Sequence, residues 1–197
     1  MNVKTDQELW DKAEEAEKRH DFLEMLSIWK TLADKGIWTV CARIGYAYEY
    51  GLQGVDIDIE QALRWYRRAV FEADDPIAHV GLGRLYYKGN GVAQNTITAC
   101  NHWKKAFDQG SADAALYLGI AYNREFGVKR DIQLAKSYFE SATKADYFYA
   151  YGALGRIALE EKKIIKGLKY YIKGYFVGRK IQKTNPYDDR LLGINKY

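Results

Sequence analysis

The chain has 197 residues, a net charge of +4, 2 prolines and 17 tyrosines. This length favours one domain that builds its own core, and so small a basic excess does not by itself indicate a nucleic-acid-binding protein. Scarce proline with abundant alanine, leucine, lysine and glutamate favours helices. There is no apolar leader near the start and no long apolar window, so we expect a cytoplasmic protein that does not bind membranes.

From the start of the chain onward, the sequence predicts pairs of helices. Residues 1–37 read as a degenerate first unit with two helical patterns, "TDQELWDKAEEAEKR" and "FLEMLSIWKTLADKG". Clear units follow at 38–74, 75–110 and 111–146, then a truncated unit at 147–178 and a C-terminal capping segment at 179–197. An apolar-glycine pair recurs at intervals of 38, 36 and 36 residues. Its four copies are Ile44-Gly45, Leu82-Gly83, Leu118-Gly119 and Leu154-Gly155. A fixed period of this size indicates a repeat architecture.

Within each unit the two helices have different patterns. The first carries apolar residues at i, i+4 and i+8, with the glycine beside that stripe, which predicts a neighbouring helix too close for a Cβ. The second carries alanines at i and i+7 around a bulky pair. Those pairs are Trp65-Tyr66, His102-Trp103, Tyr138-Phe139 and Tyr170-Tyr171. Asp58, Asn95 and Asp131 precede the second helices as N-caps, and Gly36 and Gly110 end second helices.

The stretch "LGRLYYKGNGVAQN" at 82–95 carries a Gly-x-Gly that resembles the start of a phosphate-binding loop. A helical pattern precedes it rather than a strand, and Asn95 follows as a cap, so the phosphate-loop context is missing. The loop also recurs in altered form at 51–55 and 126–128. We therefore expect Gly89, Asn90 and Gly91 to turn one helix back on the next.

The pattern Ala-xxx-Leu-Gly-xx-Tyr-xx-Gly-x-Gly-Val-xx-Asp/Asn-xxx-Ala, followed by the aromatic pair, resembles the Sel1-like repeat, a relative of the tetratricopeptide repeat. The resemblance implies an all-α fold, a right-handed αα-solenoid superhelix of about five helix pairs whose first helices line a concave face. It also implies a non-catalytic role, because such proteins commonly act as adaptors, assembly factors or bacterial immunity proteins that bind a cognate toxin.

The residues themselves indicate no chemistry. Metalloprotease, P-loop and serine-hydrolase motifs are absent from the sequence. Cys41 and Cys100 have no His or Cys at ligand spacing and are expected to be buried thiols. We predict no catalytic residue, no cofactor and no metal site.

Helical geometry places one face of the first helices opposite the core stripe. We expect this face to bind a protein partner with an acidic or mixed surface, through exposed aromatic and basic anchors. The candidate residues are Tyr46, Tyr50, Arg84, Lys88, Ile120, Arg124 and Arg156.

The predicted function is therefore binding of one dedicated protein partner, such as a toxin in a toxin–immunity pair, or an adaptor role. A peptide-binding chaperone or assembly factor is an alternative. A nucleic-acid binder is a less favoured one, since Lys166, Lys169 and Lys173 in the basic segment at 162–183 read as a solvated helix face.

Overall fold

A computed structural model describes residues 3–184, and every regular element in that part of the chain is helical. The chain divides into two compact units, Met1–Ala106 and Phe107–Tyr197. The α-helices are α1 (Val3–Lys18), α2 (Phe22–Asp34), α3 (Cys41–Tyr50), α4 (Ile59–Ala73), α5 (Pro76–Lys88), α6 (Thr96–Asp108), α7 (Ala112–Arg124), α8 (Ile132–Thr143), α9 (Phe148–Glu160) and α10 (Ile164–Thr184). A short 3-10 helix, Trp38–Val40, precedes α3. The all-α fold predicted from the sequence is confirmed.

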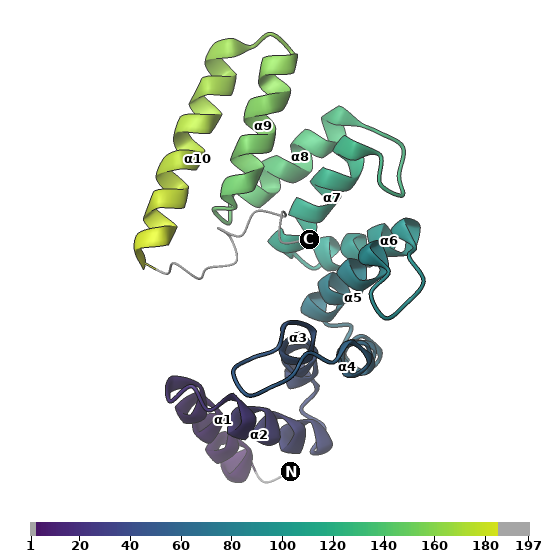
Figure 1. Ribbon diagram of the computed structural model, residues 1–197, viewed down its shortest axis with the longest axis vertical. Coiled ribbons are helices and arrows are strands. Elements are labelled where there is room, and N and C mark those ends of the chain that lie inside the picture. Colours follow the sequence, from purple (N-terminus) through teal and green to yellow (C-terminus); the bar gives the residue numbers. More distant parts are fainter. Residues whose placement is uncertain (1–2, 185–197) are drawn as a thin grey trace. The chain divides into compact units, whose positions relative to one another are not determined.

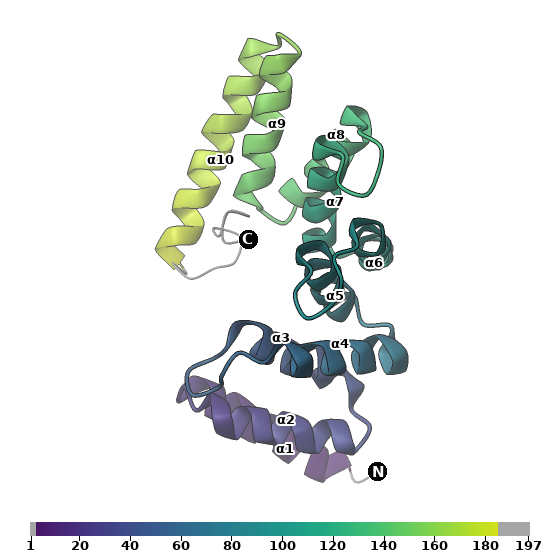
Figure 2. The same cartoon turned by 45° about the vertical axis from the view of Figure 1, so that its right-hand side comes forward.

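Consecutive helices form antiparallel pairs, as Figure 1 and Figure 2 show for α1 with α2 and for α9 with α10. In the first unit α3 pairs with α4, and both also pack against α5 of the next pair. In the second unit α7 pairs with α8, and α8 packs against α9. Within each unit, neighbouring pairs therefore pack on one another, as the pairs of a repeat protein do.

The predicted caps are present. The carboxylates of Asp58 and Asp131 accept hydrogen bonds of 3.0 and 2.9 Å from the backbone amides of Gln61 and Leu134. The side chain of Asn95 accepts one of 2.9 Å from Thr98. These bonds satisfy amides that a helix start leaves unpaired, so each second helix begins where the sequence predicts.

Glycines in the first helices make room for aromatic rings of the second helices. A Cβ built on Gly45 would lie 2.7 Å from the ring of Tyr66, and one on Gly119 would lie 2.7 Å from the ring of Phe139. Gly83 faces Trp103 in the same way. Tyr66 and Phe139 are fully buried. The recurring glycine is thus a packing requirement, as expected, because a methyl group would overlap a ring that cannot move.

The Gly-x-Gly loop is a turn. Gly89 and Gly91 have φ values of +70° and +68°, in the left-handed region that glycine adopts without strain. At the corresponding turn after α7, Glu125 occupies the same region with φ of +62°. The erosion of the loop motif in this repeat therefore leaves a side chain in a strained backbone conformation.

The end of the last helix and the boundary predicted for the last unit do not coincide. Helix α10 continues to Thr184, six residues past the predicted end at residue 178. Gly174 and Gly178 do not stop it. A Cβ on Gly174 would lie 2.9 Å from Tyr151 of α9, so this glycine allows a close approach, whereas one on Gly178 would lie at an ordinary 3.9 Å from Phe148. The first signal able to end the helix is Asn185-Pro186. Residues 179–184 of the predicted cap belong to α10, and residues 185–197, with the apolar run Leu191–Ile194, lie outside the described residues.

Candidate partner-binding surface

The structure brings four of the seven predicted partner-binding residues together in the first unit. Tyr46 and Tyr50 lie on α3, and Arg84 and Lys88 lie on α5, which packs against α3. The other three, Ile120 and Arg124 on α7 and Arg156 on α9, belong to the second unit.

A buried ion pair forms the base of the α3–α5 cluster, by which we mean Tyr46, Glu49, Tyr50, Arg84 and Lys88. The guanidinium of Arg84 donates from Nε and Nη2 to the two carboxylate oxygens of Glu49, at 3.1 and 2.5 Å. The hydroxyl of Tyr66 on α4 donates to the same carboxylate at 2.7 Å. Burial and the Glu49 charge raise the pKa of Tyr66 well above its usual value, so this hydroxyl keeps its proton.

The outer part of the cluster consists of two tyrosine rings and one amino group. The rings of Tyr46 and Tyr50 lie 4.6 Å apart, and the Arg84 guanidinium lies 5.4 Å from the centre of the Tyr50 ring. Both tyrosines are half-buried, and Lys88 is exposed. Partial burial lowers the pKa of Lys88, while Glu49 acts in the opposite direction. The guanidinium of Arg84, which is fixed by Glu49, therefore holds Tyr50 in place beside the exposed amino group of Lys88.

Two of the seven predicted residues were expected to be exposed but are buried. Arg84 is 8% exposed and Ile120 is 7% exposed. The apolar stripe at i, i+4 and i+8 predicts one buried and one solvated side for each first helix. Residues 78–85 of α5 are all buried, as are most residues from 114 to 122 of α7, so the structure encloses these two helices on nearly every side. Arg84 thus supports the cluster from inside and is not an exposed anchor.

In the second unit, Arg156 lies at a groove between α9 and α10. The groove has a volume of about 430 Å³, and Phe148, Tyr149, Tyr171 and Tyr175 supply its aromatic lining. Its side at Gly152 is open, since a Cβ added there would meet no atom within 4 Å. Arg156 and Arg124 are both exposed, as predicted, so the guanidinium of Arg156 borders an aromatic recess that the sequence analysis did not foresee.

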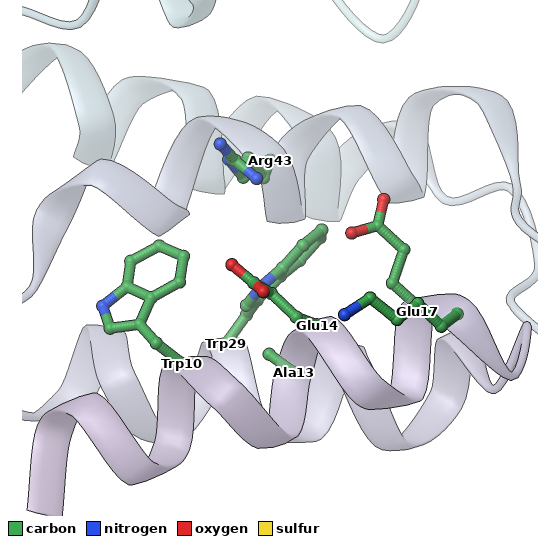
Figure 3. A pocket seen from close by; sticks show the side chains of 7 residues that line it. Trp10, Ala13, Glu14, Glu17, Trp29 and Arg43 are labelled. Atoms are coloured by element: carbon green, nitrogen blue, oxygen red, sulfur yellow. The ribbon is translucent and has the colours of Figure 1, made fainter.

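A further recess, missed by the sequence analysis, lies between α1, α2 and α3 in the first unit. Figure 3 shows Trp10, Glu14 and Glu17 of α1 projecting toward α3, where Arg43 lies opposite them. The recess has a volume of about 360 Å³, and Trp29 contributes to its lining. Arg43 lies 6.0 Å from the centre of the Trp10 ring. The acidic pattern of residues 8–17 around Trp10 was the available signal, but it was assigned only to a degenerate helix pair.

A histidine pair lies apart from these surfaces. The Nδ1 atoms of His79 and His102 are 2.8 Å apart, and His79 Nε2 lies 2.8 Å from the Asp74 carboxylate. Burial, followed by the neighbouring His79 and Lys105, lowers the pKa of His102 to about 4. Burial raises the pKa of Cys100 to about 11, so its thiol stays protonated. Residues 3–184 contain no cluster of His, Cys, Asp or Glu suited to hold a metal ion, and none of their helices is long and apolar enough to span a bilayer.

Comparison with known proteins identifies a repeat family that matches most of the helices described above. The model of the Sel1 repeat matches residues 39–70, 76–111 and 112–147, which correspond to the three clear units predicted from the sequence. An ERAD-associated E3 ubiquitin-protein ligase component of Arabidopsis thaliana, HRD3B, is 34% identical over 104 residues, which make up 52% of this chain and 16% of that protein. The chain spans between 14% and 20% of the length of the curated relatives it matches.

Two solved structures share the fold. A Sel1 repeat protein from Oxalobacter formigenes superposes with a TM-score of 0.76 at 26% identity, covering 89% of this chain and 76% of its own. An immunity protein from Pseudomonas aeruginosa superposes with a TM-score of 0.55 at 22% identity, covering 78% of this chain and 58% of its own. These similarities agree with the helix pairing described above.

Proposed function

We propose that this chain, which belongs to the Sel1 repeat family, binds one dedicated protein partner through the α3–α5 cluster and catalyses no reaction. Sel1 repeats mediate protein interactions, and the matched scaffold is one that usually carries no catalytic site. What we propose is which surface of the chain binds and what kind of partner it takes.

The observation that carries the proposal is the set of contacts that holds the α3–α5 cluster together. Its two half-buried tyrosine rings lie against each other in a tilted arrangement, and Arg84, itself held by Glu49, lies against Tyr50. Interfaces obtain most of their affinity from a few aromatic and cationic anchors that lose little entropy on binding. Lys88 at the edge of the cluster favours a partner with carboxylates facing the tyrosines.

An immunity or adaptor role is the most specific form of the proposal. One structural neighbour is an immunity protein, but at 22% identity its likeness supports the fold and not the partner. A cognate toxin is therefore one candidate partner, and an adaptor function requires the same anchors. A peptide-binding chaperone remains the alternative, and it would bind many short peptides and not one folded protein.

Affinity capture from the cells that produce the protein tests this proposal. The bait is the full chain, and the test variant is Tyr46→Ala/Lys88→Glu, which leaves the buried Glu49–Arg84 pair intact. We expect one protein captured in near-stoichiometric amount by the wild type and lost with the variant. Arg67→Glu, which reverses an exposed charge on α4, is the matched control and should retain the partner. Retention of every captured protein by the double variant would show that the cluster is not the binding surface.

A further inference from the structure

The second aromatic residue of the bulky pair is buried in α4 and α8 but exposed in α10. Tyr66 on α4 is 0% exposed because it lies between two first helices: a Cβ on Gly45 of α3 or on Gly81 of α5 would come within 2.7 or 2.5 Å of its ring. Phe139, the corresponding residue of α8, is also 0% exposed. In both repeats a helix of the following pair packs against the second helix.

Tyr171 holds the same position in α10, yet it is 41% exposed. Its ring packs against Gly155 of α9, where a Cβ would lie 2.9 Å away, as Tyr66 packs against Gly45. The side that Gly81 covers in the case of Tyr66 is open at Tyr171. Among residues 3–184, therefore, no first helix of a following pair packs on α10.

Around Tyr171 the open side of α10 is apolar along three turns. Its exposed apolar residues are Ile164, Ile165, Leu168, Tyr171, Ile172, Tyr175 and Phe176. Counted from Ile164 they fall at i, i+1, i+4, i+7, i+8, i+11 and i+12, which at 100° per residue is one helix face, and Ile165 and Phe176 are 72% and 65% exposed. Single exposed apolar residues are ordinary, but a contiguous face of this kind marks an interaction surface. At 1.5 Å per residue it is about 18 Å long, which fits a helix of about three turns.

Charge determines what kind of helix fits this face. Residues 162–184 contain eight basic residues and no acidic one. Lys166, Lys169 and Lys173 are exposed along one flank of the apolar face, and Arg156 lies across the groove that Tyr171 and Tyr175 line. A second copy of α10 would bring like charges together, whereas an acidic helix would pair with both flanks.

We propose that the open face of α10 binds an acidic amphipathic helix of a partner protein. The bound helix packs on α10 as α5 packs on α4, with a small residue over Tyr171 in the role that Gly81 has over Tyr66. Its apolar side covers Leu168 and Ile172, and its carboxylates face Lys169 and Lys173. This surface is separate from the α3–α5 cluster, and its binding is measured with variants that leave Tyr46 and Lys88 unchanged.

The test uses the full chain and a fluorescein-labelled synthetic helix. This probe carries leucine and a central alanine on one face and glutamate on both flanks, and fluorescence anisotropy reports its binding. We expect binding that weakens about 10-fold or more when lysine replaces the glutamates of the probe or when Lys166→Glu/Lys169→Glu/Lys173→Glu is introduced. Ile165→Ser/Ile172→Ser/Phe176→Ser should abolish it. The control Lys104→Glu/Lys105→Glu/Lys144→Glu reverses three exposed lysines elsewhere and should bind like the wild type.

The side chains changed on α10 and in the lysine control are exposed, so circular dichroism should show unaltered helix content in these variants. Equal affinity for the glutamate and lysine probes, or no binding of either, would overturn the proposal. Co-sedimentation with anionic phosphatidylserine vesicles that displaces the probe would assign the face to a lipid surface instead. A dimer in light scattering that Ile172→Ser disrupts would assign it to a second copy. Binding that occurs only after Leu191→Ser/Leu192→Ser would assign it to the chain's own C-terminal segment.

Discussion

Arg84 of α5 and Glu49 of α3, 35 residues apart in the sequence, form a bidentate ion pair in the interior of the first unit. Each lacks the water that would otherwise solvate its charge, so each depends on the other. The pair joins two successive first helices and, through the Tyr66 hydroxyl, the second helix between them.

Replacing one member of this pair should cost more stability than replacing both. Glu49→Ala leaves the Arg84 charge buried without its carboxylate, and we expect a loss of about 3–5 kcal/mol in the free energy of unfolding. Glu49→Leu/Arg84→Met keeps the volume apolar and should cost clearly less. Urea denaturation of the two variants measures the difference. A double variant that is as unstable as Glu49→Ala would show that the pair contributes through its own attraction rather than through the cost of isolating one charge.

Two glycines of the second unit should respond to alanine in opposite directions. Gly119→Ala places a methyl group 2.7 Å from the buried Phe139 ring, and we expect a loss of about 1–3 kcal/mol. Gly152→Ala, also in a first helix, meets no atom within 4 Å and should gain up to about 1 kcal/mol from helix propensity. Thermal unfolding of the two variants shows whether each change raises or lowers the stability. Similar destabilisation by the two changes would contradict the packing role of the recurring glycine.

Glu125→Gly should stabilise the protein. Glu125 has φ of +62° at the turn where the second clear repeat has Gly89 with φ of +70°. Relief of left-handed strain, less the entropy cost of glycine, should give a net gain of about 0.5–1 kcal/mol. Arg67→Gly in the exposed part of α4 is the control, and it should lose about 1 kcal/mol. If Glu125→Gly also destabilises, the turn does not carry strain.

Stability should fall in mild acid because of His102. Burial lowers its folded-state pKa to about 4, whereas the unfolded side chain titrates near about 6.5. The unfolded chain therefore binds more protons between these values, so the stabilising effect is complete above about pH 6.5 and is lost as the pH falls toward 4. His102→Phe keeps a ring against Tyr86 and should flatten the melting temperature in this window. His20→Asn, at an exposed histidine, should retain the slope, and an unchanged slope in His102→Phe would exclude His102 as its source.

The features of the repeat that depend on residues close together in the sequence were predicted correctly. The caps at Asp58 and Asp131, the turn at Gly89 and the glycine–aromatic contacts all depend on residues within one unit, and the structure has each of them. The extension of α10 to Thr184 was not predicted because the recurring pattern of the second helices stops before residue 178, and the close contact of Gly174 with Tyr151 of α9 does not belong to that pattern.

The candidate site was harder to predict, since it depends on contacts between units of the repeat. Tyr46, Tyr50 and Lys88 fall together because α3 packs against α5, which the spacing implied. The burial of Arg84 follows from Glu49, a residue that sequence reasoning did not connect with it. The open face of α10 was hidden because its aromatic residues match those that are buried in the preceding repeats.

Site-specific photocrosslinking tests the central proposal, partner binding at the α3–α5 cluster, most directly. Benzoylphenylalanine is placed at Tyr50 in the full chain within the producing cells, and in a parallel strain at Arg67, an exposed position of α4. We predict one discrete covalent adduct from position 50 and none from position 67, with Lys88→Glu reducing the adduct at 50. No adduct at position 50, or the same adducts at both positions, would contradict partner binding at this surface.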